Sequence, residues 1–137
     1  MGLYLCIFDE DEEVFGVEVG FYADFAHLRD AVARSLEDGD LGDRFPVLML
    51  HSDCDGEWSP HDAARLAVEL DEIERAFTEL PPRPLESEWK LQVAKSLGLR
   101  PANLGECFFD IDGEPLLLRL KALCKISVEW SLPILFQ

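Results

Sequence analysis

The sequence predicts an α/β or α+β protein, in which a small mixed sheet of about four to five strands is covered by about four helices. Short segments with strand character stand at both ends of the chain, and segments with helical periodicity lie between them. The 137 residues are 48% hydrophobic, enough for a sizeable core without disulfide bonds or metal ions. We therefore expect a single globular domain over residues 1–137.

An N-terminal β-hairpin is the first predicted element. Residues 3–8 form a continuous apolar run, residues 15–19 alternate apolar with polar or small side chains, and five acids at 9–13 separate the two. An unbroken apolar run is typical of a strand inside a sheet, whereas alternation is typical of a strand with one solvated face. We expect the first strand to be central and the second to lie near an edge.

A helix and a buried strand are predicted next. Phe25, Leu28, Val32 and Leu36 recur at helical spacing, which predicts a helix over about 23–38 with Gly39 as its C-terminal glycine. Residues 45–50, with the sequence FPVLML, are too few and too uniformly apolar for a surface helix. Because proline is tolerated at the start of a strand, we expect this run to be a buried strand.

The most strongly marked helix begins after a polar loop. Ser59 is predicted as its N-cap, Pro60 as its first residue and Asp62 as the acid at the third helical position. Apolar side chains then recur every three or four residues at Ala63, Leu66, Leu70, Ile73, Phe77 and Leu80. Prolines 81, 82 and 84 end the helix, since proline cannot continue its hydrogen-bond ladder.

The last third of the chain predicts two more helices and a final strand. Ser87 is expected to cap a short helix that Gly98 closes, and residues 107–110 to form a short strand or an extended bridge. Pro115 is expected to begin the last helix, and residues 133–136 to be a strand. The strand order is left open.

Charge is the most informative property for function. The chain has 12 basic and 28 acidic side chains and a net charge of −16. Residues 1–80 carry 21 acids and 5 bases, and residues 81–137 carry 7 of each, so the first segment holds all of the net charge. Such a surface repels nucleic-acid phosphates and attracts a basic protein. A solvated face that only maintains solubility is the alternative.

A cytoplasmic location is expected. Residues 1–8 are too short and lack the basic residues of a signal peptide, Cys6 stands where a myristoylation signal needs Ser or Thr, and no apolar run approaches membrane-spanning length. The four cysteines form no CxxC pair, which favours reduced thiols. They are Cys6, Cys54, Cys107 and Cys124.

No cluster makes a convincing catalytic or metal site. The loop at 51–58, with the sequence HSDCDGEW, resembles a calcium loop only in its centre, because His51 and Asp62 occupy the two end positions that require acids of the right length. The phrase DIDG at 110–113 matches less well, so a turn is favoured over metal binding at both. Acids around Cys54 would raise a thiol pKa, which disfavours a Cys54–His51 catalytic pair. We expect no catalytic residue, metal ion or cofactor.

The acidic runs are the expected binding site. Further acids follow the first helix at Glu37, Asp38, Asp40 and Asp43 and lie on the long helix at Glu69, Asp71, Glu72 and Glu74. Trp58 is the predicted aromatic anchor, with a hydrophobic staple before Ser59 as the alternative. The acidic residues assigned to the site are Asp9, Glu10, Asp11, Glu12, Asp53, Asp55 and Glu57.

Several phrases resemble the bacterial immunity protein 70 family. They are GLYLCIFDED at 2–11, GVEVG at 16–20, RFP at 44–46, LHSDCDGEWSP at 50–60, SLGLRP at 96–101 and LPILFQ at 132–137. The resemblance implies a small cytoplasmic protein of a polymorphic toxin system, which neutralises the toxin domain encoded beside it. It supplies no catalytic residues.

The expected function is therefore stoichiometric inhibition of a basic toxin domain, for which a nuclease phosphate site would be one target. Nanomolar binding needs about −12 kcal/mol, more than screened charges provide, so apolar anchors are expected as well. A small metal-dependent enzyme or an acidic housekeeping adaptor are the alternatives.

Overall fold

The computed structural model confirms the predicted combination of sheet and helices, and it describes every residue except 1, 38–39, 53–54 and 86. The hairpin and the final strand are where the sequence predicted them. The elements are β1 (Gly2–Asp9), β2 (Glu12–Phe21), α1 (Tyr22–Leu36), α2 (Pro46–Leu50), β3 (Glu57–Trp58), α3 (Pro60–Thr78), α4 (Glu88–Leu97), the 3-10 turn η1 (Gly105–Cys107), α5 (Leu116–Trp130) and β4 (Ile134–Phe136).

The sheet has the strand order β2-β1-β4-β3. The sequence predicted a mixed sheet. In the structure, all three strand pairings are antiparallel. As predicted, β1 lies inside the sheet and β2 lies at an edge. The two ends of the described chain are neighbours in the sheet, because Tyr4 N donates to Gln137 O at 3.0 Å and Gln137 N donates to Tyr4 O at 2.9 Å.

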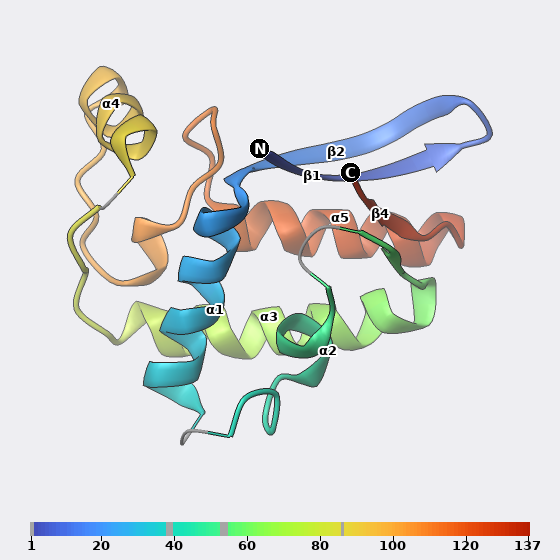
Figure 1. Cartoon of the computed structure of the whole chain (residues 1–137), viewed down its shortest axis with the longest axis horizontal. Coiled ribbons are helices and arrows are strands. Elements are labelled where there is room, and N and C mark those ends of the chain that lie inside the picture. The colour runs from blue at the N-terminus through green and yellow to red at the C-terminus, as the bar shows by residue number, and fades with distance from the viewer. Residues whose placement is uncertain (1, 38–39, 53–54, 86) are drawn as a thin grey trace.

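The helices cover one face of this sheet. Figure 1 shows α5 directly beneath the sheet, α3 beneath α5, and α1 crossing both helices. Helix α4 stands apart at the end of the molecule where the base of the hairpin lies. The core contains the β1 side chains Leu3, Leu5 and Ile7, which alternate along the strand and are 0% exposed. The same alternation turns the intervening β1 side chains to the other face of the sheet.

The predicted strand at 45–50 is wrong, because Pro46–Leu50 is the short helix α2. Its N-terminus is capped by a residue that is distant in sequence. The Glu69 carboxylate on α3 accepts hydrogen bonds from Val47 N at 3.1 Å and Leu48 N at 3.0 Å. A carboxylate at a helix N-terminus satisfies backbone donors that have no partner in the helix. This tertiary cap overrides the local strand preference.

The helix boundaries mostly agree with the sequence. Ser59 and Asp62 form the expected reciprocal cap of α3, in which Asp62 N donates to Ser59 Oγ and Ser59 N donates to Asp62 Oδ2. Gly98 ends α4 in the left-handed conformation, with φ of 68°. The glycine predicted to close α1, Gly39, is not among the described residues. The expected extended bridge near 107–110 is present as an isolated pairing between Phe109 and Pro115.

None of the described helices is long and apolar enough to cross a lipid bilayer.

Candidate partner-binding surface

The face of the sheet that points away from α5 carries an apolar centre with an acidic border. We call this surface the outer sheet face and define it by six side chains from all four strands. Its apolar members are half-buried and its acids are exposed. The assignment follows from the register, because directly paired residues in adjacent strands point to the same face. The six residues are Tyr4 and Phe8 on β1, Glu13 and Glu18 on β2, Leu135 on β4 and Glu57 on β3.

Tyr4 is fixed across this face. Its hydroxyl donates to Glu13 Oε1 at 2.6 Å, and a Cβ added to Gly16 would lie 1.9 Å from the same hydroxyl oxygen. The absence of a side chain on Gly16 therefore provides the room that the Tyr4 side chain occupies. Burial, together with the hydrogen bond from Tyr4 to the Glu13 carboxylate, raises the pKa of Tyr4 to about 12. The phenol stays neutral and continues to donate its hydrogen bond at physiological pH.

The turn between β1 and β2 projects five consecutive exposed acids, Asp9 to Glu13. Glu10 has a φ of 59°, which lies in the left-handed region of backbone conformation. Residues other than glycine and asparagine disfavour this region. Five neighbouring carboxylates repel one another and generate a local negative potential. The turn is thus both the most acidic and a locally strained part of the hairpin.

The predicted acidic surface is wrong for two of its members, Glu37 and Glu69, which are buried at 4% and 9% exposure. Glu37 accepts hydrogen bonds from the backbone N–H groups of Gly42, Arg44 and Phe45. Glu69 caps α2 as described above. Both carboxylates organise the backbone around α2, a use of acidic residues that charge counting cannot distinguish from surface charge.

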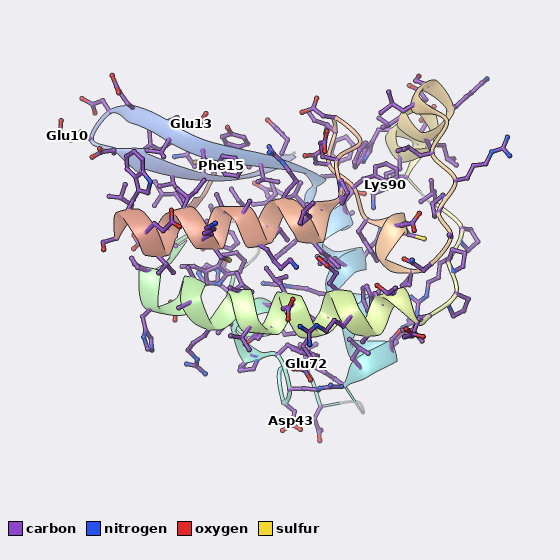
Figure 2. The ribbon with its side chains drawn as sticks, turned by 180° about the vertical axis from the view of Figure 1, so that it is seen from behind. Glu10, Glu13, Phe15, Asp43, Glu72 and Lys90 are labelled. Carbon is purple, nitrogen blue, oxygen red and sulfur yellow. The ribbon has the colours of Figure 1, made fainter. Side chains whose placement is uncertain are left out.

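The remaining acids do not form one continuous patch. Figure 2 shows Glu10 and Glu13 on the hairpin, and Asp43 and Glu72 on the opposite side of the molecule beyond α3. Glu72 is paired with Arg44, so part of the charge on that side is neutralised. On the long helix, Asp71 and Glu74 both lie within ion-pair distance of Lys121. By contrast, no described base lies within ion-pair distance of the hairpin acids Asp9 to Glu13.

Trp58 does not serve as an exposed anchor. Its side chain is 1% exposed, and its indole Nε1 donates to Val47 O at 3.2 Å. The ring packs edge to face on Phe136, with centroids 4.6 Å apart. The tryptophan belongs to the core beneath β3, so the prediction of an aromatic anchor at this position is wrong.

The polar loop before α3 is only partly described, and two of its predicted residues, Asp53 and Cys54, lie outside the described part. Asp55 and Glu57 are exposed, and Glu57 borders the outer sheet face from the edge opposite the hairpin. His51 stacks on Phe136 at 4.3 Å, and its Nδ1 and Nε2 atoms each lie 2.8 Å from a backbone carbonyl oxygen. Both ring nitrogens of His51 are therefore engaged with the backbone of the loop, and the side chain helps to position it.

The second acidic loop is a turn. Asp110 is 1% exposed, and its Oδ1 atom accepts hydrogen bonds from Asp112 N and Glu114 N. Its Oδ2 atom lies 3.3 Å from Arg119 Nε, at ion-pair distance but outside hydrogen-bond geometry. Within the described ranges, no group of three His, Cys, Asp or Glu side chains is placed to hold a metal ion.

The apolar members of the outer sheet face were missed by sequence reasoning. The run at 3–8 was predicted only as a central strand, without a difference between its two faces, whereas Tyr4 and Phe8 are half-buried on the face away from the helices. A tyrosine in an otherwise apolar run was the available signal. Its hydroxyl needs a polar partner, which a helix-covered face seldom provides.

Comparison with known families gives one result. The family model described as Immunity protein 70 matches residues 3–136, nearly the whole chain. No curated protein and no solved structure matches the chain significantly.

Proposed function

Because the chain belongs to the immunity protein 70 family, we propose that it binds the cognate toxin domain of a polymorphic toxin system and inhibits it stoichiometrically in the cytoplasm. The proposed binding surface combines the hairpin acids Asp9 to Glu12 with the outer sheet face. Asp55 extends this surface, and Asp53 belongs to the same loop. The toxin is expected to present a basic surface, as the phosphate-binding site of a nuclease does.

The observation that carries this proposal is the combination of apolar and acidic side chains on one face. Tyr4, Phe8 and Leu135 are half-buried, while Glu13, Glu18 and Glu57 around them are exposed. Protein interfaces typically have an apolar, often aromatic centre surrounded by a polar rim. The acids would accelerate encounter with a basic partner, and the apolar centre would slow dissociation.

An apolar groove lies next to this surface. It has a volume of about 660 Å³ and runs between the base of the hairpin and α4, with Glu18 and Phe21 on one side and Leu97 on the other. Phe21 is 53% exposed and Leu97 is 56% exposed. Large exposed apolar side chains grouped around a groove are typical of protein interaction sites. The groove would extend the area from which the toxin gains affinity.

The test uses the toxin domain encoded by the neighbouring gene. The association rate is measured as a function of ionic strength for the wild-type protein, for Glu10→Lys and for Asp43→Lys. Both variants change the charge by the same amount, but Asp43 lies on the opposite side of the molecule. We expect Glu10→Lys to lower the association rate about tenfold at low salt, and Asp43→Lys to change it less than about twofold.

A third variant tests the apolar centre. Phe8→Ala removes a half-buried ring without emptying the core, and we expect it to raise the dissociation rate about tenfold or more while the association rate stays close to that of the wild type. Inhibition of toxin activity should be complete at one equivalent. An association rate that does not depend on salt, together with equal effects of Glu10→Lys and Asp43→Lys, would exclude this surface.

A further inference from the structure

A cavity of about 300 Å³ lies between α1, residues 83–85, the start of α4 and the segment at 104–108. It is separate from the outer sheet face. Among the residues that the structure describes, its lining includes three of the 12 basic side chains and one of the 28 acidic ones. Its described charged and titratable members are His27, Asp30, Arg34, Arg83, Lys90 and the thiol of Cys107.

Lys90 is the unusual member of this lining. The residue is 5% exposed (labelled in Figure 2), and its Nζ atom lies 5.0 Å from the centre of the Phe108 ring and 5.8 Å from those of Trp89 and Phe109. Cation–π contacts attract an ammonium group but offer it no acceptor. Among the described residues, no hydrogen bond or ion pair reaches this Nζ atom.

The direction of the pKa shift of Lys90 is consistent with an ammonium group that has no anionic partner. Burial lowers the pKa of Lys90, and the negative charge of Asp24 opposes this effect only in part. The Asp24 carboxylate is already engaged, because it accepts hydrogen bonds from Phe21 N, Ser87 Oγ and Trp89 Nε1. The Nζ atom is not completely sealed from solvent, so an anion that enters the cavity can reach it. A cation on a largely buried side chain is usually paired.

The two arginines can complete an anion site. Arg34 bonds to Asp30 through Nε at 3.0 Å, and its side chain is 72% exposed. Arg83 is exposed, and its Nη2 atom lies 3.4 Å from Ser35 Oγ. Guanidinium groups at the entrance of a cavity, with an ammonium group inside it, match the oxygen atoms of a phosphate or carboxylate group.

We propose that this cavity binds a small oxyanion, a phosphate or carboxylate group, with Lys90 as the buried cationic ligand and Arg34 and Arg83 at the entrance. The anion supplies the missing acceptor for the Lys90 ammonium group. The proposal does not depend on toxin binding. A free ion and an acidic group carried by a partner protein offer the same chemistry to the site.

The test measures thermal unfolding at pH 7 while sodium phosphate replaces sodium chloride at constant ionic strength. Constant ionic strength is essential, because any salt screens the repulsion within a chain of charge −16. We expect the melting temperature of the wild type to rise with phosphate and to reach a plateau, as for a ligand that binds the folded state. Lys90→Met should remove the phosphate dependence.

Two further variants make the test specific. Lys95→Met removes an exposed lysine from the same helix and should leave the phosphate response unchanged. Arg83→Gln should raise the phosphate concentration at half-saturation about tenfold, and it keeps the proposal testable if Lys90→Met does not fold. Equal phosphate responses in all four proteins, or no response in the wild type, would overturn the proposal.

Sodium acetate, titrated in the same way, reports whether a single carboxylate is sufficient. If the natural anion is carried by the toxin, saturating phosphate should weaken toxin binding to the wild type and leave binding to Lys90→Met unchanged. If the natural anion is a free ion, phosphate should leave toxin affinity unchanged in both proteins.

Discussion

The Glu69 carboxylate on α3 accepts a hydrogen bond from the backbone N–H of Leu48 at 3.0 Å and thereby closes the first turn of α2. A second bond, from Val47 N at 3.1 Å, shares the same carboxylate. A five-residue helix is too short to be stable by itself. The short helix is therefore maintained by one buried side chain that is distant in sequence, and this dependence can be measured.

Glu69→Ala should destabilise the protein by about 2–3 kcal/mol, because it leaves two backbone N–H groups near α3 without a charged acceptor. Glu69→Gln keeps one acceptor oxygen and should lose less. The measurement is urea unfolding followed by circular dichroism. Equal stability of Glu69→Ala and the wild type would show that the cap contributes nothing.

The same carboxylate predicts a dependence of stability on pH. Burial raises the pKa of Glu69 above its ordinary value of 4.5. The folded chain keeps this proton at pH values where the unfolded chain has lost it, so the contribution of Glu69 to stability falls as the pH rises from 4.5 through the folded-state pKa. We expect the free energy of unfolding of the wild type, minus that of the non-titrating Glu69→Gln, to decrease over this window. A difference that increases with pH would contradict the assignment.

Asp24 links α1 to α4. It is 2% exposed and accepts bonds from Ser87 Oγ at 2.5 Å and Trp89 Nε1 at 2.9 Å, in addition to capping Phe21 N. Asp24→Ala should destabilise the protein by about 3 kcal/mol and increase amide hydrogen exchange in α4 more than in α3 or α5. Glu88→Ala, an exposed change in α4 itself, serves as the control. Uniform exchange across the helices would argue against a specific link.

Two cysteines should be unreactive in the folded protein. Burial raises the pKa of Cys6 to about 11 and that of Cys124 to about 12, and both are 0% exposed. Because the thiolate is the reactive form, iodoacetamide at pH 8 should leave both unmodified in the native state and modify both in urea. The experiment uses a Cys54→Ser background and mass spectrometry of peptides. Native modification of either cysteine would contradict this prediction.

The hairpin turn should gain stability from a change that removes its strain. Glu10→Asn replaces a residue at φ of 59° by one that tolerates this conformation, and we expect a gain of about 1 kcal/mol. Asp11→Asn removes the same charge without relieving the Glu10 backbone, so it measures the electrostatic part alone. A smaller gain for Glu10→Asn than for Asp11→Asn, in thermal melts, would exclude backbone strain as the cause.

The sequence predicted the elements whose causes are local. The Ser59–Asp62 cap, the Gly98 termination and the turn residues between β1 and β2 depend on neighbours within a few positions. The prediction of a strand at 45–50 was wrong because the conformation of these residues depends on Glu69, about 20 residues away. Local patterning cannot report a cap that only the folded chain brings into place.

The candidate site was predicted only in part, because part of it also depends on contacts between residues that are distant in sequence. Exposed acids at 9–13 follow from composition, but the burial of Trp58 and the exposure of Tyr4 depend on which face of the sheet the helices cover. Charge counting also could not separate the capping carboxylates of Glu37 and Glu69 from surface acids. The Lys90 cavity had no sequence signal, since its walls come from segments far apart in the chain.

The pairing of β1 with β4 imposes an order on biosynthesis. Residues 134–136 supply the strand that joins β1 to β3, so neither pairing can form until these residues have been synthesised. Glu57 reaches its place beside the rest of the outer sheet face only through that strand. A nascent chain can form the hairpin early, because the contacts between β1 and β2 are local, whereas sheet closure must wait for contacts that span almost the whole sequence. Protection against a toxin that binds this face would therefore begin only after translation has passed β4.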